Sequence, residues 1–317
     1  MRSSNKTKFA DRYNDMPRAL RKGKYLFCFC MVFLQVVGFL VMYIGVNGQS
    51  ILLAFQRVVG IDDNGFEIVE WSMKNFTEAL SLFAGGEKAE MRIAFRNTAF
   101  YFIAIYFVMN PTSFVLSYFF YKKLPGSKFF RVAIYLPNII SGVAIVSMFK
   151  SFIAPDGPIS ELLYNMFGYE MPSLLRNETT ATPTILAYSL FFGIQVNLLL
   201  FQGAFNRIPQ EILDAAQLDG VTGFQELTKI MIPIMWPTLS TILLLGMTNI
   251  FGATGPILLF TGGMYETTTF NYWIYDQVKV QGSYNLPSAM GLMVTAVNLP
   301  LVLIFRYLAN KVEDVQY

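Results

Sequence analysis

The chain has 317 residues, of which 54% are hydrophobic and only 14% are charged, and its formal net charge is +3. Soluble domains carry about 25% charged residues, so this composition lacks the polar surface that a water-soluble globule requires. There is no histidine, and the two cysteines, Cys28 and Cys30, lie inside the first apolar segment. A disulfide framework, a metal site and histidine-based catalysis are therefore not expected, and neither is a cofactor.

Six apolar segments are long enough to cross a bilayer as helices, because about 20 residues span a hydrocarbon core of about 30 Å. In chain order they cover residues 25–46, 98–120, 131–153, 183–205, 238–260 and 288–308. The first segment follows a basic stretch, but it is longer than the apolar part of a signal peptide and no small-residue cleavage site follows it. We interpret it as an uncleaved span, and the predicted fold is an all-α polytopic membrane protein with about six transmembrane helices.

Lysine and arginine are distributed unevenly along the chain. Eight precede the first span. The connection into the third span has Lys122, Lys123, Lys128 and, at its end, Arg131, with no acid, whereas the loop after the first span is acidic. Basic loops stay in the cytoplasm, so both termini are predicted to be cytoplasmic in a multi-pass protein of the cell (inner) membrane. The predicted organisation is a basic cytoplasmic segment, a first span with its extracytoplasmic loop, a core of spans and a cytoplasmic tail: 1–24, 25–97, 98–310 and 311–317.

The connection between the fourth and fifth spans, about 206–233, departs from the basic pattern and contains the signal of a short helix. Pro209 suits the first helical position, Glu211 is favourable in the first turn, and Gly220 suits a left-handed end. Four residues are spaced to share one face: Ile212, Ala215, Ala216 and Asp219. An amphipathic helix on the inner leaflet is one interpretation, but the segment lacks the basic face of such helices, which favours a protein partner.

The same connection resembles the EAA loop of permeases of binding-protein-dependent ATP-binding-cassette (ABC) importers. The resemblance is carried, at the family's spacing, by Asp214-Ala215-Ala216, Asp219-Gly220, Phe224, Ile230 and Pro233. Asp214 stands for the usual Glu, and Val221 for a usual Ala. In that family the loop is the coupling helix, which docks on a cytoplasmic ATPase. The resemblance therefore implies an ATPase-coupling joint formed by Pro209, Glu211, Asp214, Ala215, Ala216, Asp219 and Gly220.

Weaker motifs extend the resemblance over about residues 90–310. Asn97-Thr98, and Phe130-Arg131 with Leu136-Pro137, resemble the family's motifs at the openings of the second and third spans. Thr261-Gly262-Gly263 with Thr267-Thr268 and Tyr275 resembles the outer loop of sugar permeases of the maltose and glycerol-phosphate type, although Met264 stands in place of the usual Gly-Pro. The resemblance implies import of a carbohydrate, either an oligosaccharide or a related polyol, delivered by a solute-binding protein. A permease for a non-sugar solute is the alternative within the family.

The chain has no Gly-x-x-x-x-Gly-Lys-Ser/Thr phosphate loop, so ATP hydrolysis is expected on a separate polypeptide and the chain is not expected to be an enzyme. The implied partners are a homologous second permease subunit, two ABC ATPase subunits, an extracytoplasmic solute-binding protein, the carbohydrate and membrane lipid, with no nucleic acid. A secondary transporter is the main rival. Proton coupling normally uses an ionisable residue within a span, and the predicted spans contain no Asp or Glu. Sodium coupling, a scaffold and a passive channel remain as alternatives.

Amide side chains within the spans are candidates for the translocation pathway, because amides offer donors and acceptors to hydroxyl-rich solutes. The densest group lies on the fourth span and comprises Gln195, Asn197 and Gln202. The alternative for each amide is a hydrogen bond across a helix contact. The sequence leaves both roles open.

Overall fold

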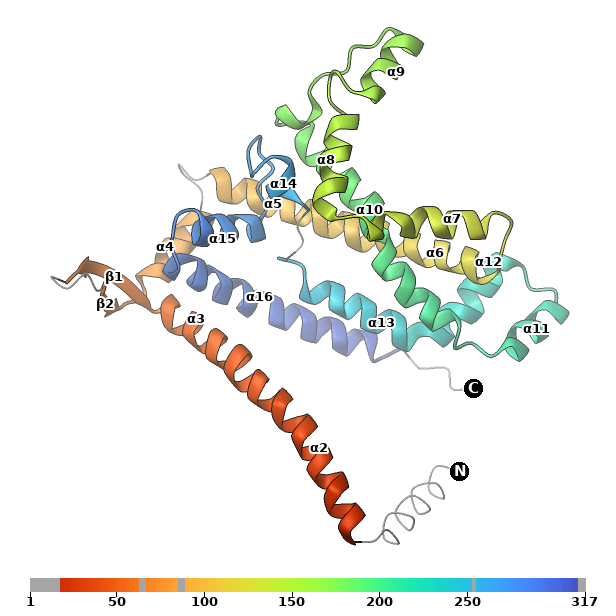
Figure 1. The fold of residues 1–317 in the computed structure, drawn as a ribbon, viewed down its shortest axis with the longest axis horizontal. Coiled ribbons are helices and arrows are strands. Elements are labelled where there is room, and N and C mark those ends of the chain that lie inside the picture. Colours follow the sequence, from red (N-terminus) through yellow and green to blue (C-terminus); the bar gives the residue numbers. More distant parts are fainter. Residues whose placement is uncertain (1–17, 63–66, 85–88, 253–254, 313–317) are drawn as a thin grey trace. The chain divides into compact units, whose positions relative to one another are not determined.

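The computed structural model describes residues 18–62, 67–84, 89–252 and 255–312. The chain divides into two compact units, Met1–Met73 and Lys74–Tyr317. Both are predominantly helical, which confirms the predicted all-α membrane fold (Figure 1). Residues 1–17 of the predicted cytoplasmic segment and residues 313–317 of the predicted tail lie outside the described residues.

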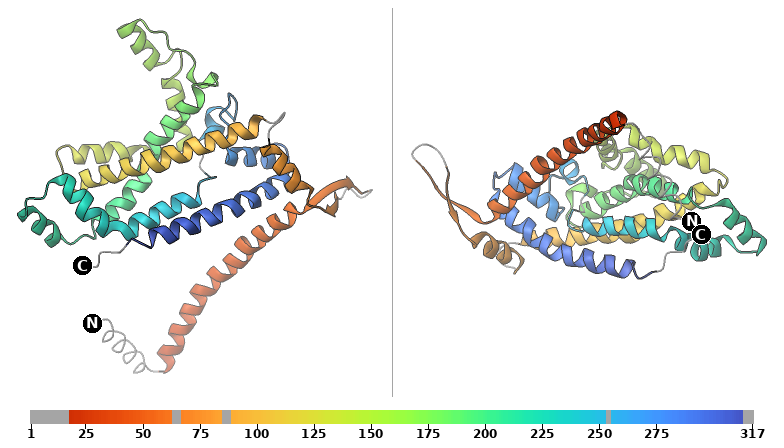
Figure 2. Two further views of the ribbon diagram at one scale, coloured as in Figure 1. Left: turned by 180° about the vertical axis from the view of Figure 1, so that it is seen from behind. Right: turned by 90° about the horizontal axis from the view of Figure 1, so that it is seen from below.

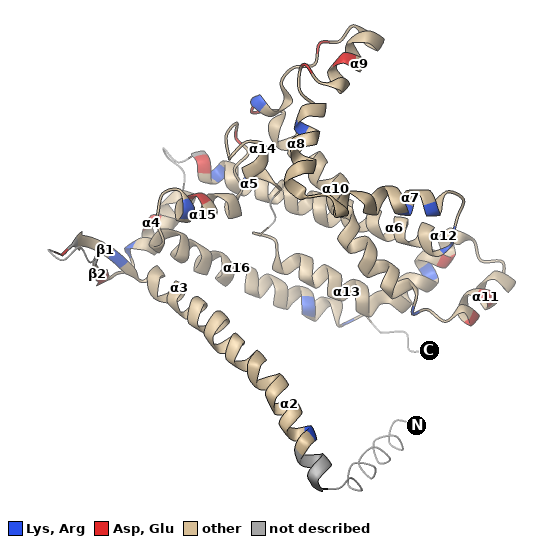
Figure 3. Cartoon of the chain, viewed as in Figure 1, with Lys and Arg blue, Asp and Glu red and all other residues tan. Residues whose placement is uncertain are grey.

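The first unit consists of one long helix followed by a β-hairpin. The helix runs through α2 (Arg18–Gly38), a π-helical stretch and α3 (Val46–Ala54), so it continues eight residues beyond the predicted end at 46. Strands β1 (Gln56–Ile61) and β2 (Glu67–Trp71) then pair antiparallel, with a bulge between Val58 and Gly60. From residue 25 to 54 the helix contains no charged residue (Figure 3), as a membrane span favours. The hairpin was not predicted.

The second unit contains the remaining helices. They are α4 (Lys74–Phe83), α5 (Ala89–Ile103), α6 (Asn110–Tyr121), α7 (Ser127–Tyr135), α8 (Gly142–Phe152), α9 (Pro158–Phe167), α10 (Ala181–Phe205), α11 (Gln210–Leu218), α12 (Gly223–Gln225), α13 (Ile232–Thr248), α14 (Ile257–Phe260), α15 (Phe270–Lys279) and α16 (Asn285–Ala309). π-helical turns join α5 to α6 and α12 to α13 into continuous helices. Figure 2 shows α13 and α16 side by side, and the two are in contact.

Five helices in the described residues are long and apolar enough to cross a membrane, and a bent pair would make a sixth. The predicted span at 131–153 is this pair, in which Ser127–Ile139 and Gly142–Phe152 meet at 108°. A 3₁₀ turn that includes Pro137 ends the first part, and Ile140 is extended. Proline removes an intrahelical bond, which explains why the apolar run does not form a straight helix.

The predicted fifth span, 238–260, is wrong in position, because the helix runs from Gly223 to Thr248 and residues 249–252 form turns. The span thus begins within the segment predicted as a connection. Thr222 and Gln225 start it with a reciprocal capping box, a favourable helix N-terminus. Glu226 lies in its first turns, so the expectation of spans without acids also fails here. The charge of Glu226 is neutralised by Lys122, whose Nζ lies 2.7 Å from Oε1.

Helices α6 and α10 form the most extensive helix contact of the second unit. Ser113 and Ser117 on α6 are fully buried, and their hydroxyls donate to the carbonyl oxygens of Ile194 and Leu198 on α10 at 3.2 and 3.0 Å. Small residues allow membrane helices to approach closely, and hydroxyls add hydrogen bonds between them. Next to this contact, Phe114, Phe201 and Phe205 pack in an apolar cluster.

We predict that Ser117→Leu separates α6 from α10 and lowers the free energy of unfolding by about 1–3 kcal/mol, because a larger side chain overpacks a closed contact. Val115→Leu is the matched control on the same helix, since Val115 is 53% exposed. The measurement is the thermal midpoint of the detergent-solubilised protein by size-exclusion chromatography. Equal midpoints for the two variants would contradict close packing at Ser117.

Candidate functional site

The predicted coupling segment forms a short helix closed by a tight turn. Pro209 is the N-cap of α11 rather than its first helical residue, with an extended backbone that starts the helix at Gln210. Gly220 has a φ of +73°, the left-handed conformation that glycine adopts without a steric penalty. The amide of Val221 then donates to Ala216 O at 3.1 Å, which closes the helix end. The predicted left-handed end is therefore present.

Helix α11 presents one face to the bundle and the other away from it. Leu213 is fully buried in the apolar cluster that contains Phe205 and Met231, and Ala216 is buried beside it. The predicted single face is thus divided, because Ala215 and Asp219 are exposed. The helix is anchored by Leu213, and its acidic side faces outward.

Two large apolar side chains next to Gly220 are almost fully exposed. Leu218 at the end of α11 is 89% exposed, and Phe224 in α12 is 76% exposed. Leu218 was not among the residues predicted from the sequence. The signal that could have identified it is an apolar residue directly before the Asp219-Gly220 pair that ends the helix. Exposed apolar groups of this size between charged residues are typical of a surface that another protein covers.

The segment after α11 is fixed to the end of α6. Lys122 Nζ lies 2.7 and 2.9 Å from the two carboxylate oxygens of Glu226, which is 3% exposed. The Tyr118 hydroxyl donates to Gly223 O at 3.3 Å. The start of the span at Gly223 is therefore held against the end of α6.

The three candidate pathway amides on α10 line three different cavities. Gln195 is 3% exposed, its Oε1 has no hydrogen-bond partner, and it borders an apolar cavity of about 680 Å³. Asn197 donates to Asn110 Oδ1 at 2.6 Å and lines a cavity of about 240 Å³. Gln202 donates to the Tyr135 hydroxyl at 3.2 Å and lines a cavity of about 510 Å³. Asn197 and Gln202 thus form hydrogen bonds between helices, which is the alternative that the sequence offers to a pathway role.

The cavity at Asn197 combines amides with an aromatic ring. Asn110 and Asn197 meet there with Asn249 and Tyr106, from α6, α10, the end of α13 and the π-helical turn. The Tyr106 ring stacks obliquely with Phe102 at 5.1 Å between centroids. Amides and ring faces together match the hydroxyls and the apolar faces of a sugar. Asn249 and Tyr106 had not been selected from the sequence because their partners come from distant segments.

An ordered loop at the other end of the unit is held by the Asn97-Thr98 pair. Asn97 is 1% exposed, and its Nδ2 donates to Glu266 O at 2.6 Å and to Thr268 O at 2.9 Å. The Thr98 hydroxyl accepts from the Phe270 amide at 2.9 Å. Because these bonds join residues about 170 positions apart, the motif fixes the loop between α14 and α15 to helix α5.

Two further helices hold the same loop. Thr182 of α10 donates to Glu266 O at 3.2 Å, and Lys150 of α8 donates to the carbonyl oxygens of Leu259 and Phe260 at 3.1 and 3.2 Å. Glu266 has a φ of +53°, which is uncommon outside glycine. The surrounding hydrogen bonds maintain this strained backbone. Lys150 thereby caps the end of α14.

Residues 80–314 match the family described as "Binding-protein-dependent transport system inner membrane component". The chain is 26% identical to Protein LplB of Bacillus subtilis (strain 168), with 61% of this chain and 62% of that protein covered. It is 26% identical to the polygalacturonan/rhamnogalacturonan transport system permease protein YteP of the same organism, with 58% of each covered. It is 28% identical to the sn-glycerol-3-phosphate transport system permease protein UgpA of Shigella flexneri, with 59% of this chain and 65% of that protein covered.

These alignments span less than two thirds of the length of the relatives. The fold is similar to that of a chain in the crystal structure of a bacterial ABC transporter involved in the import of the acidic polysaccharide alginate. The TM-score is 0.75 at 20% identity, with 93% of this chain and 99% of that chain covered. At this identity the likeness concerns the fold.

We predict that Asn97→Ala releases the loop between α14 and α15, because the carbonyls of Glu266 and Thr268 lose a buried donor. An unsatisfied buried group costs about 1–3 kcal/mol, so amide hydrogen exchange at residues 264–270 should rise about tenfold or more. Glu266→Gln is the control, since it removes only the exposed ion pair with Arg96, worth about 0–1 kcal/mol. Equal exchange in the two variants would show that Asn97 does not hold the loop.

Proposed function

We propose that this chain, which belongs to the family of inner membrane components of binding-protein-dependent transport systems, is a permease subunit of an ATP-driven importer for a carbohydrate. The supporting observation is the segment around α11: Leu213 anchors α11, Leu218 and Phe224 are exposed beside Gly220, and the Lys122–Glu226 pair holds the following span to the end of α6. This geometry suits a joint that receives a displacement from another protein.

In this proposal, the chain itself catalyses no covalent reaction. Two ATPase subunits in the cytoplasm hydrolyse ATP, and one of them holds α11 through its exposed end. When nucleotide binding brings the ATPases together, α11 moves with them. The buried side of α11 and the Lys122–Glu226 pair then carry the displacement to α6 and to the span that starts at Gly223. Hydrolysis returns the spans to the starting arrangement.

The remaining partners of the proposed complex are a homologous second permease subunit and an extracytoplasmic solute-binding protein. The distribution of lysine and arginine supports an orientation with both termini and α11 in the cytoplasm. In that orientation the loop held by Asn97 lies on the extracytoplasmic side, where a binding protein delivers its solute.

The carbohydrate assignment is supported by the relatives and by one cavity. YteP is named for polygalacturonan and rhamnogalacturonan transport, and the transporter of similar fold imports alginate. The cavity at Asn197 is lined by three amides and the Tyr106 ring, which are uncharged side chains of the kind that bind sugars. Among the three amides of α10, Asn197 is therefore the favoured pathway residue, with Gln195 and Gln202 as further candidates. A non-sugar solute is the alternative.

Secondary transport is the rival function, and Glu226 is the acid that would carry its proton. Glu226 lies in the first turns of its span and its carboxylate is held by Lys122. A carboxylate fixed by a cation at a span end is structural rather than a proton relay. This placement favours the ATP-driven mechanism.

We predict that Leu218→Asp weakens co-purification of the ATPase subunits by about 10- to 100-fold, because burial of a leucine stabilises a contact by about 1.5–3 kcal/mol. Leu124→Asp is the matched control, an exposed leucine in the neighbouring loop after α6. The measurement is the amount of ATPase retained on the affinity-tagged permease. Undiminished retention in Leu218→Asp would remove α11 as the docking element.

We predict that Asn197→Leu lowers solute uptake about tenfold while the ATPases still co-purify, because the cavity loses its central amide. Val196→Leu is the control on the same helix, since Val196 is 64% exposed and faces away from the cavity. Uptake of labelled oligosaccharide into membrane vesicles measures the effect. Equal uptake by the two variants would place the pathway elsewhere.

A further inference from the structure

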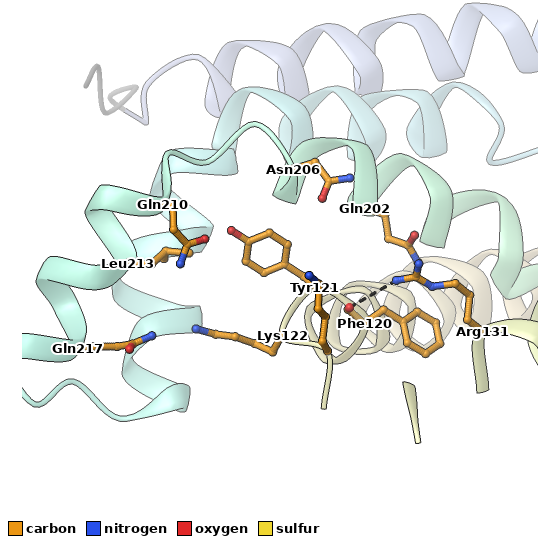
Figure 4. A pocket seen from close by; sticks show the side chains of 10 residues that line it. Phe120, Tyr121, Lys122, Arg131, Gln202, Asn206, Gln210, Leu213 and Gln217 are labelled. Carbon is orange, nitrogen blue, oxygen red and sulfur yellow. Dashed lines mark hydrogen bonds between the residues drawn. The ribbon is translucent and has the colours of Figure 1, made fainter. Parts of the chain in front are cut away.

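A polar cavity of about 510 Å³ lies behind α11, between the ends of α6 and α10 and the start of α7 (Figure 4). Three cations border it, Lys122, Lys123 and Arg131, and no acidic side chain of the described residues does. The motif Phe130-Arg131 was noted in the sequence, and the coupling mechanism does not use it. The cavity therefore holds a concentration of positive charge that the proposed function leaves unexplained.

Two of the three cations have no carboxylate partner. Lys122 is paired with Glu226, but neither Lys123 nor Arg131 has a carboxylate within 4.0 Å in the described part of the chain. The Arg131 guanidinium lies 5.6 Å from the centre of the Phe120 ring and donates to Phe120 O at 3.4 Å. This contact uses one of its five N–H donors and holds the group at the cavity wall.

The backbone also directs the second cation to this place. Lys123 has a φ of +51°, a left-handed conformation that few residues other than glycine adopt. Lys123 follows Lys122, the C-cap of α6, and its side chain borders the cavity. A strained residue that positions a charge is a reason to look for a ligand.

Uncharged donors complete the lining. The amides of Gln202 and Asn206 come from the end of α10, and those of Gln210 and Gln217 come from α11. Figure 4 shows Gln210 and Gln217 on the α11 side of the cavity, facing Tyr121 and Lys122. Asp214, the acid of α11 near this wall, accepts from the Gln210 amide at 3.2 Å and does not line the cavity.

We propose that this cavity is a binding site for a phosphate group carried by an anionic ligand. Arginine and lysine with several amide donors supply the charge and the hydrogen bonds that phosphate oxygens require. Basic pockets between membrane helices at the cytoplasmic side take anionic lipid headgroups in this way. A phospholipid of the inner leaflet and a soluble phosphate compound offer the same group.

The site also has a consequence for the coupling segment, which rests on the proposed function. A phosphate held between Arg131 on α7 and Gln217 on α11 would fasten α11 to the bundle from behind. Its outward face, with Leu218, stays free for the ATPase. Occupancy would then determine how tightly a movement of α11 is joined to the spans.

The test measures ligand retention and does not depend on transport. The full-length chain, with the subunits that co-purify with it, is placed in nanodiscs that contain phosphatidylglycerol and phosphatidylcholine, and bound lipid is counted by native mass spectrometry. Lys123→Gln with Arg131→Gln should reduce phosphatidylglycerol retention about 30-fold, since each basic residue near an anionic headgroup contributes about 1 kcal/mol. Phosphatidylcholine should be unaffected.

Matched variants separate the cavity from the general charge of the surface. Lys128→Gln with Lys229→Gln removes two exposed basic residues that do not line the cavity, and it should retain phosphatidylglycerol. Arg131→Lys keeps the charge and should retain most of the binding. The thermal midpoint of each variant shows whether it folds. Lys123 and Arg131 are exposed, so their replacement by Gln should leave folding intact.

A second arm identifies the source of the phosphate. Inorganic phosphate in excess, added to protein in nanodiscs of phosphatidylcholine alone, should protect residues 122–131 from hydrogen exchange if the ligand is soluble. If Lys123→Gln with Arg131→Gln loses phosphatidylglycerol and phosphate gives no protection, the ligand is a lipid. If phosphate protects these residues and phosphatidylglycerol is retained, the ligand is soluble. Equal phosphatidylglycerol retention in the cavity variant and in Lys128→Gln with Lys229→Gln, together with no protection by phosphate, would overturn the proposal. A loss of ATPase binding without these changes concerns the coupling role only.

Discussion

The Lys122–Glu226 ion pair is the contact on which the end of the second unit that carries α11 depends. Glu226 is 3% exposed, and a buried carboxylate without a partner would be strongly destabilising. With Lys122 in place, the fifth span can begin at Gly223 immediately after the turn at Gly220. The same pair holds the segment after α11 against the end of α6. Both the coupling segment and the basic cavity behind it are positioned by this one interaction.

Helices α5 and α6 form one continuous helix that connects the two loops that carry the functional proposals. Asn97 and Thr98 near the beginning of this helix hold the loop before α15, and Lys122 directly after its end holds the segment before α13. Ser113 and Ser117 pack the α6 half of this helix against α10. One continuous element thus links both ends of the second unit.

The sequence predicted what depends on long apolar runs and on local motifs. Helices near 98–120, 183–205 and 288–308 were found because their composition is uniformly apolar, and Gly220 because its spacing after Asp214 is characteristic. The fifth span was misplaced because Glu226 and Lys229 make its first turns look polar, and only a residue 104 positions away neutralises Glu226. The burial of Ala216, the cavity at Asn197 and the partners of Asn97 likewise depend on distant segments, which a single sequence does not reveal.

The π-helical turn at Ala104–Met109 ends two residues before Pro111, so two features that bend helices lie together in the linking helix. Such a turn contains one residue more than an α-helical turn, so its hydrogen bonds can be redistributed between neighbouring carbonyls with little loss. The half held at Asn97 and the half held at Lys122 thus meet where a long helix bends most readily.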